Sequence, residues 1–176
     1  GRRICWGAAL GVAAKGGHTE TIRWLCVHGP SELSYEYAVR CGFLDILEGL
    51  CHRDPDFLIL EHTDYYCTEA ARTGNIEILK WLRSHGAGWG EDACASAAGA
   101  GHAEALMWLH ENGCLWDEEA CANAAAAGHT EIVMWLRKNG CPWDERACAN
   151  AAGGGHLATL VWLRESGCPW DEMTSE

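Results

Sequence analysis

A glycine with similar neighbours on both sides recurs at a constant interval, and this period constrains the fold more than any other feature of the chain. It is found at Gly74, Gly101, Gly128 and Gly155. Gly17 and Gly42 carry a similar neighbourhood at irregular spacings. A fixed period between about 20 and 50 residues is typical of solenoids and related arrays, in which one supersecondary unit is stacked repeatedly.

This marker glycine divides the chain into six copies and the truncated start of a seventh, all within one predicted domain, 1–176. The copies run over 5–29, 30–54, 62–86, 89–113, 116–140 and 143–167. Positions are given below as offsets from the marker glycine, so that position −5 is the fifth residue before it.

Each copy is expected to form two short helices on either side of its marker glycine. Asp117 and Asp144, like Ser31 in copy two, stand where a side-chain oxygen caps the first helix. The glycine is expected to end that helix in a left-handed conformation. The second helix has apolar residues at i, i+3 and i+4 spacing, as in Ile132, Val133, Trp135 and Leu136. Helices this short are marginal alone, so we predict an all-α solenoid of stacked helix-turn-helix repeats that bury one another.

The helical part of the repeat resembles that of ankyrin repeats. The residues that carry this resemblance in copy five are Ala124, Ala125, Gly128, His129, Glu131, Ile132, Val133, Leu136 and Gly140. The period is shorter than the ~33 residues of ankyrin repeats, and the residues of the β-hairpin finger are missing, as in tandem-repeat proteins of protists, algae and giant viruses. The resemblance implies an ankyrin-like α-solenoid that binds protein partners on a concave inner-helix surface, with no cofactor and no catalysis.

The charge of the chain bears on the class of its partner. The formal net charge is −12, from 25 acidic and 13 basic residues. Phosphate binding requires a basic face, so nucleic acid is not expected as the main partner, and a basic protein is favoured. There is no signal peptide and no apolar run of membrane-spanning length. We therefore expect no membrane partner, a cytoplasmic location and a monomer, cut from a longer array because copy six lacks a polar outer face.

Most of the eleven cysteines lie in two periodic columns. One column is Cys67, Cys94, Cys121 and Cys148, and the other is Cys114, Cys141 and Cys168. Residues of one column should be separated by roughly 10 Å, the spacing of packed helices, which is too far for a disulfide. We therefore expect small buried apolar residues in a reducing compartment.

Metal binding and cysteine catalysis are not expected. Structural zinc sites usually have cysteine pairs two to four residues apart, and the chain has no C-x-x-C. Histidine at position +1 recurs in four copies, which predicts a structural residue that bonds the turn between helices. A nucleophile would need one singular cysteine beside one singular histidine, whereas here both recur. No metal, cofactor or enzymatic activity is therefore predicted.

Copy two departs from the pattern. Gly49 replaces the tryptophan of the second helix, and a longer connection with the apolar run 57–60 follows. We expect residues 55–61 to cover the gap that Gly49 leaves. The tryptophans of the other copies recur at helical spacing and are expected in the core between copies.

Partner contacts are expected on the first helices, at positions that the core does not determine. These candidate residues are Tyr37, Arg40, Tyr65, Glu69, Arg72, Ser96, Asn123 and Asn150. Tyrosine and arginine are enriched in binding hot spots, so specificity is expected to depend mainly on Tyr37, Arg40, Tyr65, Glu69 and Arg72. Two alternatives stay open. One is a structural spacer or scaffold segment of a larger protein, with these side chains merely solvated, and the other is a thiol- or metal-based sensor.

Overall fold

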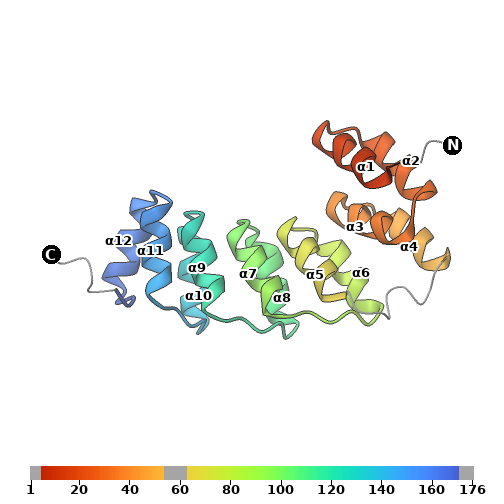
Figure 1. Cartoon of the computed structure of the whole chain (residues 1–176). Coiled ribbons are helices and arrows are strands. Elements are labelled where there is room, and N and C mark those ends of the chain that lie inside the picture. Colours follow the sequence, from red (N-terminus) through yellow and green to blue (C-terminus); the bar gives the residue numbers. More distant parts are fainter. Residues whose placement is uncertain (1–4, 54–62, 171–176) are drawn as a thin grey trace. The chain divides into compact units, whose positions relative to one another are not determined.

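The computed structural model describes residues 5–53 and 63–170, which form helix pairs connected by short turns (Figure 1). No strand occurs in these two ranges. The helices are α1 (Trp6–Lys15), α2 (Thr19–His28), α3 (Ser31–Cys41), α4 (Leu44–Arg53), α5 (Thr63–Arg72), α6 (Ile76–Ser84), α7 (Glu91–Gly99), α8 (Ala103–Glu111), α9 (Glu118–Ala126), α10 (Thr130–Lys138), α11 (Glu145–Gly153) and α12 (Leu157–Glu165). Each predicted copy is one such pair, so the predicted all-α repeat solenoid is confirmed.

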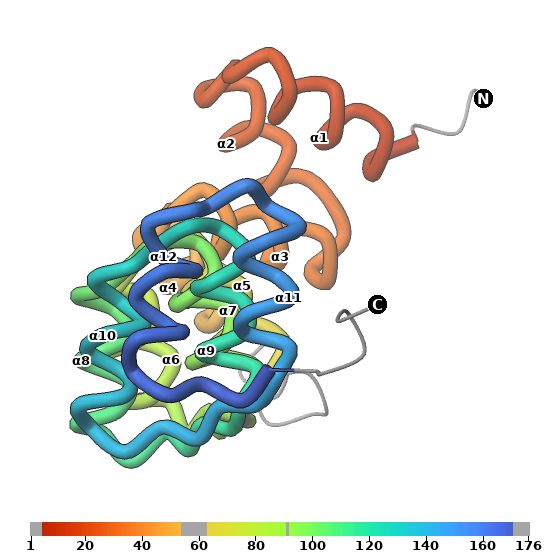
Figure 2. The backbone as a smooth tube through the Cα atoms, turned by 90° about the vertical axis from the view of Figure 1, so that its left-hand side faces the viewer, coloured from red at the N-terminus to blue at the C-terminus, as the bar shows by residue number. Residues whose placement is uncertain are grey.

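The helices group into two compact units. Unit 1 comprises Gly1–Tyr66 and Glu77–Gly88, and unit 2 comprises Cys67–Ile76 and Trp89–Glu176, so that copy three contributes to both. In unit 2, α7 packs on α9 and α9 packs on α11. Figure 2 shows these first helices along one side and the second helices α8, α10 and α12 along the other. Equivalent side chains of successive copies therefore form columns.

The core of unit 2 is built from small residues of the first helices and branched residues of the second. In copy five, α9 buries four alanines and Cys121, while α10 buries Ile132, Val133 and Leu136. Alanine has no side chain beyond Cβ, so adjacent first helices approach closely. Because apolar burial contributes about 25 cal/mol per Å², each copy depends on the area that its neighbours remove from water.

In unit 1, the core of α1 to α4 is centred on larger side chains. Leu10, Tyr35 and Leu47 are all fully buried. The Tyr35 ring lies 6.2 Å from the Tyr66 ring. Copy two also corrects the expected cap: Pro30 is the N-cap of α3, and Ser31 is already its first residue. Proline has a fixed φ and donates no N–H, so it suits a helix start better than its interior.

The predicted aspartate caps are confirmed in unit 2. The Asp117 carboxylate accepts a hydrogen bond from the backbone N–H of Glu119 at 3.0 Å. The Asp144 carboxylate does the same for the N–H of Arg146, also at 3.0 Å. Each bond satisfies one of the free N–H groups of a helix start, which is typically worth ~1 kcal/mol.

The marker glycines have positive φ, as predicted, and the structure gives a second reason for glycine. Gly101 and Gly128 have φ of 83° and 75°. A Cβ at Gly101 would lie 2.7 Å from the His129 ring of the next copy, and a Cβ at Gly128 would collide with His156 in the same way. The histidine at position +1 therefore packs against the bare backbone of the preceding turn.

The histidines at position +1 pack on a glycine and do not form the predicted bond to the turn between helices. His102, His129 and His156 are the N-cap residues of α8, α10 and α12, and none makes a side-chain capping bond. The expectation that they bond the turn between helices was therefore wrong for these caps. Their rings instead fill the space over a glycine one copy earlier.

Two glycine substitutions separate backbone strain from this contact. Gly155 has φ of 74°, but nothing lies within 4 Å of the position of its Cβ. Gly155→Ala should cost only the ~1–2 kcal/mol of a left-handed alanine. Gly128→Ala should cost a further ~1–3 kcal/mol, because the His156 ring must move. Urea unfolding followed by circular dichroism measures both changes.

The histidine provides the control. If the further cost comes from the ring, His156→Ala should remove most of it in a Gly128→Ala/His156→Ala double variant. Equal destabilisation by Gly128→Ala and Gly155→Ala would show that the ring contact has no energetic weight.

Candidate partner-binding surface

Three of the predicted contact residues lie in unit 1. Tyr37 is half-buried, and the Arg40 guanidinium lies 5.7 Å from its ring centre. Arg40 also donates to Glu36 at 3.0 Å. Tyr65 is 44% exposed and meets the Tyr66 ring edge to face, with ring centres 5.6 Å apart. The structure therefore brings Tyr37 and Arg40 together, and it leaves almost half of Tyr65 accessible to a partner.

The other five predicted residues lie in unit 2, where they differ in accessibility. Arg72 donates twice to Glu69, at 3.1 and 2.7 Å. Ser96 is half-buried on α7, and Asn123 is exposed on α9. Asn150 donates to the carbonyl of Ala122 at 3.3 Å, one copy earlier. Asn123 therefore offers an exposed amide, whereas the exposed Arg72 is paired within its own helix.

Position −5 also contributes to the contact between copies. A Cβ at Gly99 would lie 3.1 Å from the Cβ of Asn123, and one at Gly11 would lie 3.5 Å from the Tyr37 hydroxyl. Asn123 and Tyr37, both at −5, thus lie across positions −2 and −6 of the preceding first helix, respectively. Substitutions there affect stacking as well as any surface recognition.

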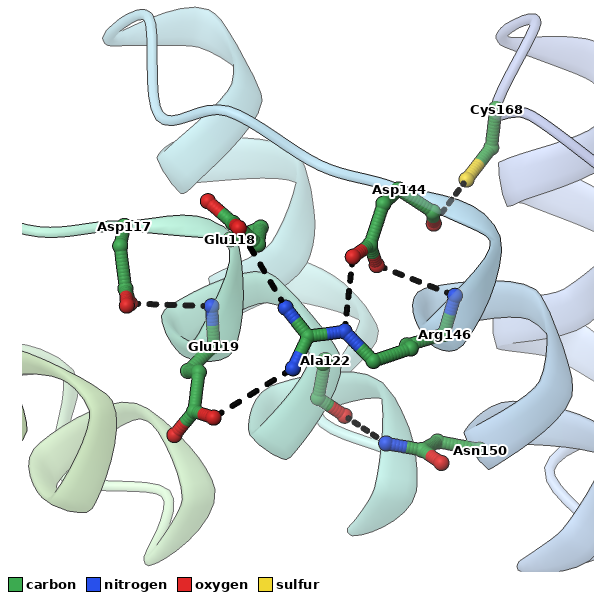
Figure 3. A network of polar contacts seen from close by, with 8 residues as sticks. All are labelled: Asp117, Glu118, Glu119, Ala122, Asp144, Arg146, Asn150 and Cys168. Atoms are coloured by element: carbon green, nitrogen blue, oxygen red, sulfur yellow. Dashed lines mark hydrogen bonds and ion pairs between the residues drawn. The ribbon is translucent and has the colours of Figure 1, made fainter.

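Arg146 connects the starts of two first helices in unit 2 (Figure 3). Its guanidinium pairs with Asp144 of its own copy at 2.7 Å, and with Glu118 and Glu119 of the preceding copy at 3.5 and 3.3 Å. These side chains are 29 to 50% exposed, so water screens the pairs. The arrangement leaves carboxylates in excess over the single cation.

Copies four and five have an acidic residue at the position where copy six has Arg146. Position −9 is Asp92 in copy four and Glu119 in copy five, and both side chains are exposed. Arg146 occupies this position only in copy six. The starts of α7 and α9 therefore form an acidic row beside the exposed amide of Asn123. We call Asp92, Ser96, Glu119 and Asn123 the acidic first-helix face.

Sequence reasoning missed how the tryptophans are arranged. They were expected in the core. However, Trp108, Trp135 and Trp162 are only half-buried, and Trp24 is 57% exposed. Among the described second-helix tryptophans, only Trp81 is buried. In unit 2, each half-buried ring meets the tryptophan at the start of its own copy: Trp108 meets Trp89, Trp135 meets Trp116 and Trp162 meets Trp143, at ring distances of 5.7, 5.7 and 6.2 Å. The two tryptophans of a copy are separated by the same number of residues in all three copies. This regularity could have indicated their pairing from the sequence.

A cationic or aromatic side chain at position +9 extends this row to the next copy. His110 stacks on Trp116 at 3.8 Å, the Arg137 guanidinium lies 4.0 Å from the Trp143 ring, and Arg164 lies 4.6 Å from Trp170. Arg137 also donates to the carbonyl of Cys141. The row therefore fixes the connections between copies.

The two cysteine columns meet in pairs, which the sequence analysis did not foresee. Cys94 is hydrogen bonded to Cys114, Cys121 to Cys141, and Cys148 to Cys168. The second thiol of each pair also donates to the carbonyl of a helix-capping residue in the preceding turn, as Cys141 does to Asp117 at 3.3 Å. The expectation of buried thiols is confirmed for both columns.

In unit 1, Gly49 opens a hollow between α2 and α4. The hollow has a volume of about 740 Å³ and is lined by Trp24, Val27, Gly49 and Leu50, among others. At its edge Arg23 donates to Asp45 at 2.6 Å, which lowers the pKa of the Asp45 carboxyl. Residues 55–61, which were expected to cover this gap, lie outside the described residues.

Neither a metal-binding cluster nor a membrane-spanning helix occurs in the residues that the structure describes. Within 5–53 and 63–170, no three or more His, Cys, Asp or Glu side chains are grouped so that they could hold a metal ion. No helix in these ranges is long and apolar enough to cross a membrane. Comparison with family models and with curated proteins found no match to the chain.

We predict that the contact between Arg137 and the row of tryptophans contributes to the free energy of unfolding. Arg137→Ala should cost ~1–2 kcal/mol, because it removes the contact with Trp143 and the bond to the Cys141 carbonyl. Lys138→Ala is the control, since the neighbouring Lys138 is exposed and should change the free energy of unfolding by less than ~0.5 kcal/mol. Equal effects in urea unfolding would contradict the structural role of Arg137.

We predict that the paired thiols react slowly with alkylating reagents. Burial and the hydrogen bond with Cys148 raise the pKa of Cys168 to about 12, so at about pH 8 it stays a thiol and not a reactive thiolate. In the folded protein, iodoacetamide should label the exposed Cys5 at least ~100-fold faster than Cys168. Mass spectrometry of peptides after short labelling measures both rates, and comparable rates would contradict the prediction. Labelling in urea should make the two cysteines similar.

Proposed function

We propose that the chain is a protein-interaction module that binds a basic segment of a partner protein through the acidic first-helix face. The observation that carries this proposal is the exposure of Asp92, Glu119 and Asn123 on helices whose opposite side is buried. A stack of short helices presents such side chains at a constant step. The resemblance to ankyrin repeats supports the same role, because the surface of their first helices is expected to bind protein partners.

Charge and hydrogen-bonding chemistry indicate the class of partner. With 25 acidic and 13 basic residues, the chain attracts cations at long range. At the acidic first-helix face, Arg146 is shared among three carboxylates, and it does not reach Asp92 in any described contact. A lysine- or arginine-rich segment would pair with Asp92 and Glu119, while Ser96 and Asn123 offer hydrogen bonds to its backbone. Such binding should weaken with added salt.

Tyr37, Arg40, Tyr65, Glu69, Arg72 and Asn150 remain predicted contacts of the same module. Tyr65 is the most accessible aromatic residue among them. Alanine substitutions at Tyr37, Tyr65 and Arg72 that left the affinity for an identified partner unchanged would remove these residues from the proposed surface.

Two other functions have support from single features. A structural spacer agrees with the internal pairing of Glu69 with Arg72 and of Asn150 with the Ala122 carbonyl. A thiol-based sensor agrees with the repeated cysteine pairs. We favour binding because Asp92, Glu119 and Asn123 are exposed, and the one cation that pairs with Glu119 is shared with two other carboxylates. A spacer should bind no basic peptide, and a sensor should change its helical signal on oxidation.

A charge-reversal experiment tests the proposed surface. The probe is a synthetic ten-residue peptide of alternating lysine and serine, titrated into the full chain by isothermal calorimetry. Asp92→Lys/Glu119→Lys should weaken binding by roughly tenfold or more, which corresponds to ~1.4 kcal/mol. The matched control is Glu104→Lys/Glu131→Lys, which changes the net charge equally on exposed positions of α8 and α10. It should weaken binding by less than about threefold.

The comparison of the two variants decides between a local site and a general charge effect. Equal weakening by both double variants would show that only net charge attracts the peptide. No binding by the unaltered chain, even at low salt, would favour the spacer.

A further inference from the structure

A hollow lies between α8 and α10 in unit 2, and we call it the α8–α10 pocket. Its volume is about 610 Å³, which falls within the range of small-molecule sites. Its lining includes Leu106 and Ile132, which are at most 6% exposed. All of its lining residues belong to copies four and five, and other described copies precede and follow these two in the sequence. The pocket is therefore formed inside the array of copies.

The residues at positions +2 and +4 explain why space remains between α8 and α10. Between copies five and six, these positions hold Thr130 and Thr159, whose hydroxyls meet at 2.7 Å. Between copies four and five, they hold Ala103 and Ile132, which have no polar side-chain atoms. Ala103 also has no atom beyond Cβ. Neither a hydrogen bond of this kind nor a long side chain at +2 therefore fills the space beside Ala103.

One charged side chain and one large aromatic ring border the pocket. Glu131 is exposed, and it takes part in none of the ion pairs found among the described residues. Trp135 follows it by four residues on α10, so the carboxylate and the indole lie on the same face of that helix. The contact of Trp135 with Trp116, at 5.7 Å between ring centres, holds the indole in place. Met107 contributes a polarisable thioether from α8.

These lining groups favour one class of ligand over the others. An anion would be repelled by Glu131 and by the net charge of −12. A neutral apolar molecule would shield the Glu131 carboxylate from water without pairing with it. A metal ion would lack ligands, because no three or more His, Cys, Asp or Glu side chains are suitably grouped within 5–53 and 63–170. A cation with an apolar body matches both the carboxylate and the apolar lining.

We propose that the α8–α10 pocket binds an arylalkylammonium ion, which is an aromatic ring joined to an ammonium group by a short alkyl chain. The ring packs against Met107 and Trp135, over Leu106 and Ile132, because aromatic and thioether groups pack favourably on a flat ring. The ammonium group pairs with Glu131 and lies near the Trp135 indole, whose electron-rich face attracts cations. The pocket is thus a ligand site in addition to the proposed partner-binding surface.

The α8–α10 pocket and the acidic first-helix face lie on different sides of unit 2. Figure 2 shows the first helices α7 and α9 along one side and the second helices α8 and α10 along the other. Asp92 and Glu119 belong to α7 and α9, whereas Met107, Glu131 and Trp135 belong to α8 and α10. The ammonium ion and the basic partner segment can therefore bind at the same time, and separate variants can test them.

Isothermal calorimetry of the full chain with benzylamine, which is protonated at neutral pH, tests the proposal. We expect a dissociation constant below about 1 mM, as is reasonable for a ligand of this size. Benzyl alcohol has the same number of non-hydrogen atoms but no charge, and it should bind at least roughly tenfold more weakly. Butylamine keeps the charge but has no ring, and it should also bind at least roughly tenfold more weakly.

Two substitutions test the pocket itself. Glu131→Gln should raise the dissociation constant of benzylamine by roughly tenfold, because it removes the carboxylate and keeps the side-chain shape. Glu104→Gln is the matched control at the equivalent position of α8, outside the pocket, and it should change the constant by less than about threefold. Ala103→Leu should fill the pocket and abolish binding, whereas Ala158→Leu, at an exposed position of α12, should not. Circular dichroism shows that each variant is folded.

The charge-reversal variants described above separate the two sites. Asp92→Lys/Glu119→Lys should keep its affinity for benzylamine, and Glu104→Lys/Glu131→Lys should lose it, which is the reverse of their expected effects on the basic peptide. The pocket proposal is overturned if the unaltered chain does not bind benzylamine at about 10 mM, or if benzyl alcohol binds equally well. Unchanged affinity of a folded Ala103→Leu variant, or equal effects of Glu131→Gln and Glu104→Gln, would overturn it as well.

Discussion

The structure depends on the contact between one helix pair and the next. Helices of nine to eleven residues cannot persist alone in water, and the alanine-rich first helices have little apolar area to bury within their own copy. Their stability comes from neighbours, as in other one-dimensional arrays. The histidine that packs on a preceding marker glycine makes this dependence specific. It requires a left-handed backbone, an absent Cβ and a ring one copy later, and all three recur at a constant spacing.

Around this contact, hydrogen bonds and ion pairs of thiol, amide and guanidinium groups fix the register between copies. Thiols of one column reach helix-capping carbonyls of the preceding copy, Asn150 reaches the Ala122 carbonyl, and Arg146 reaches two glutamates. These interactions hold the edges of an interface whose centre is apolar. The row of tryptophans does the same on the side of the second helices, where cations at position +9 connect it with the following turn. These polar groups are therefore used for stacking between copies, whereas Asp92 and Asn123 of the acidic first-helix face are exposed.

The sequence predicts the fold well, because the features that define it are local. The period, the glycine before each second helix and the aspartates before α9 and α11 all act within one copy. What the sequence does not reveal lies between copies. The contact of His156 with Gly128 joins two adjacent copies, and no residue near His156 indicates it. Helical spacing placed Trp135 on the apolar stripe, but the width of that stripe depends on how neighbouring pairs approach, and the ring lies at its margin. The candidate site is less predictable still: Asn123 and Asn150 share the immediate context A-C-A-N-A-A, yet one is exposed and the other is bonded to its neighbour.

The long-range contacts connect positions that lie one period apart, give or take a small offset, and this limits how such a gene can change length. Adding or removing one whole repeat unit recreates every interface, because the new neighbours carry matching residues at −6, −3, +1 and +4. A single inserted residue within a helix rotates all later side chains by about 100° and mismatches the next interface. Unequal recombination between repeats is therefore structurally neutral where small insertions are not, so the family of viable lengths is discrete.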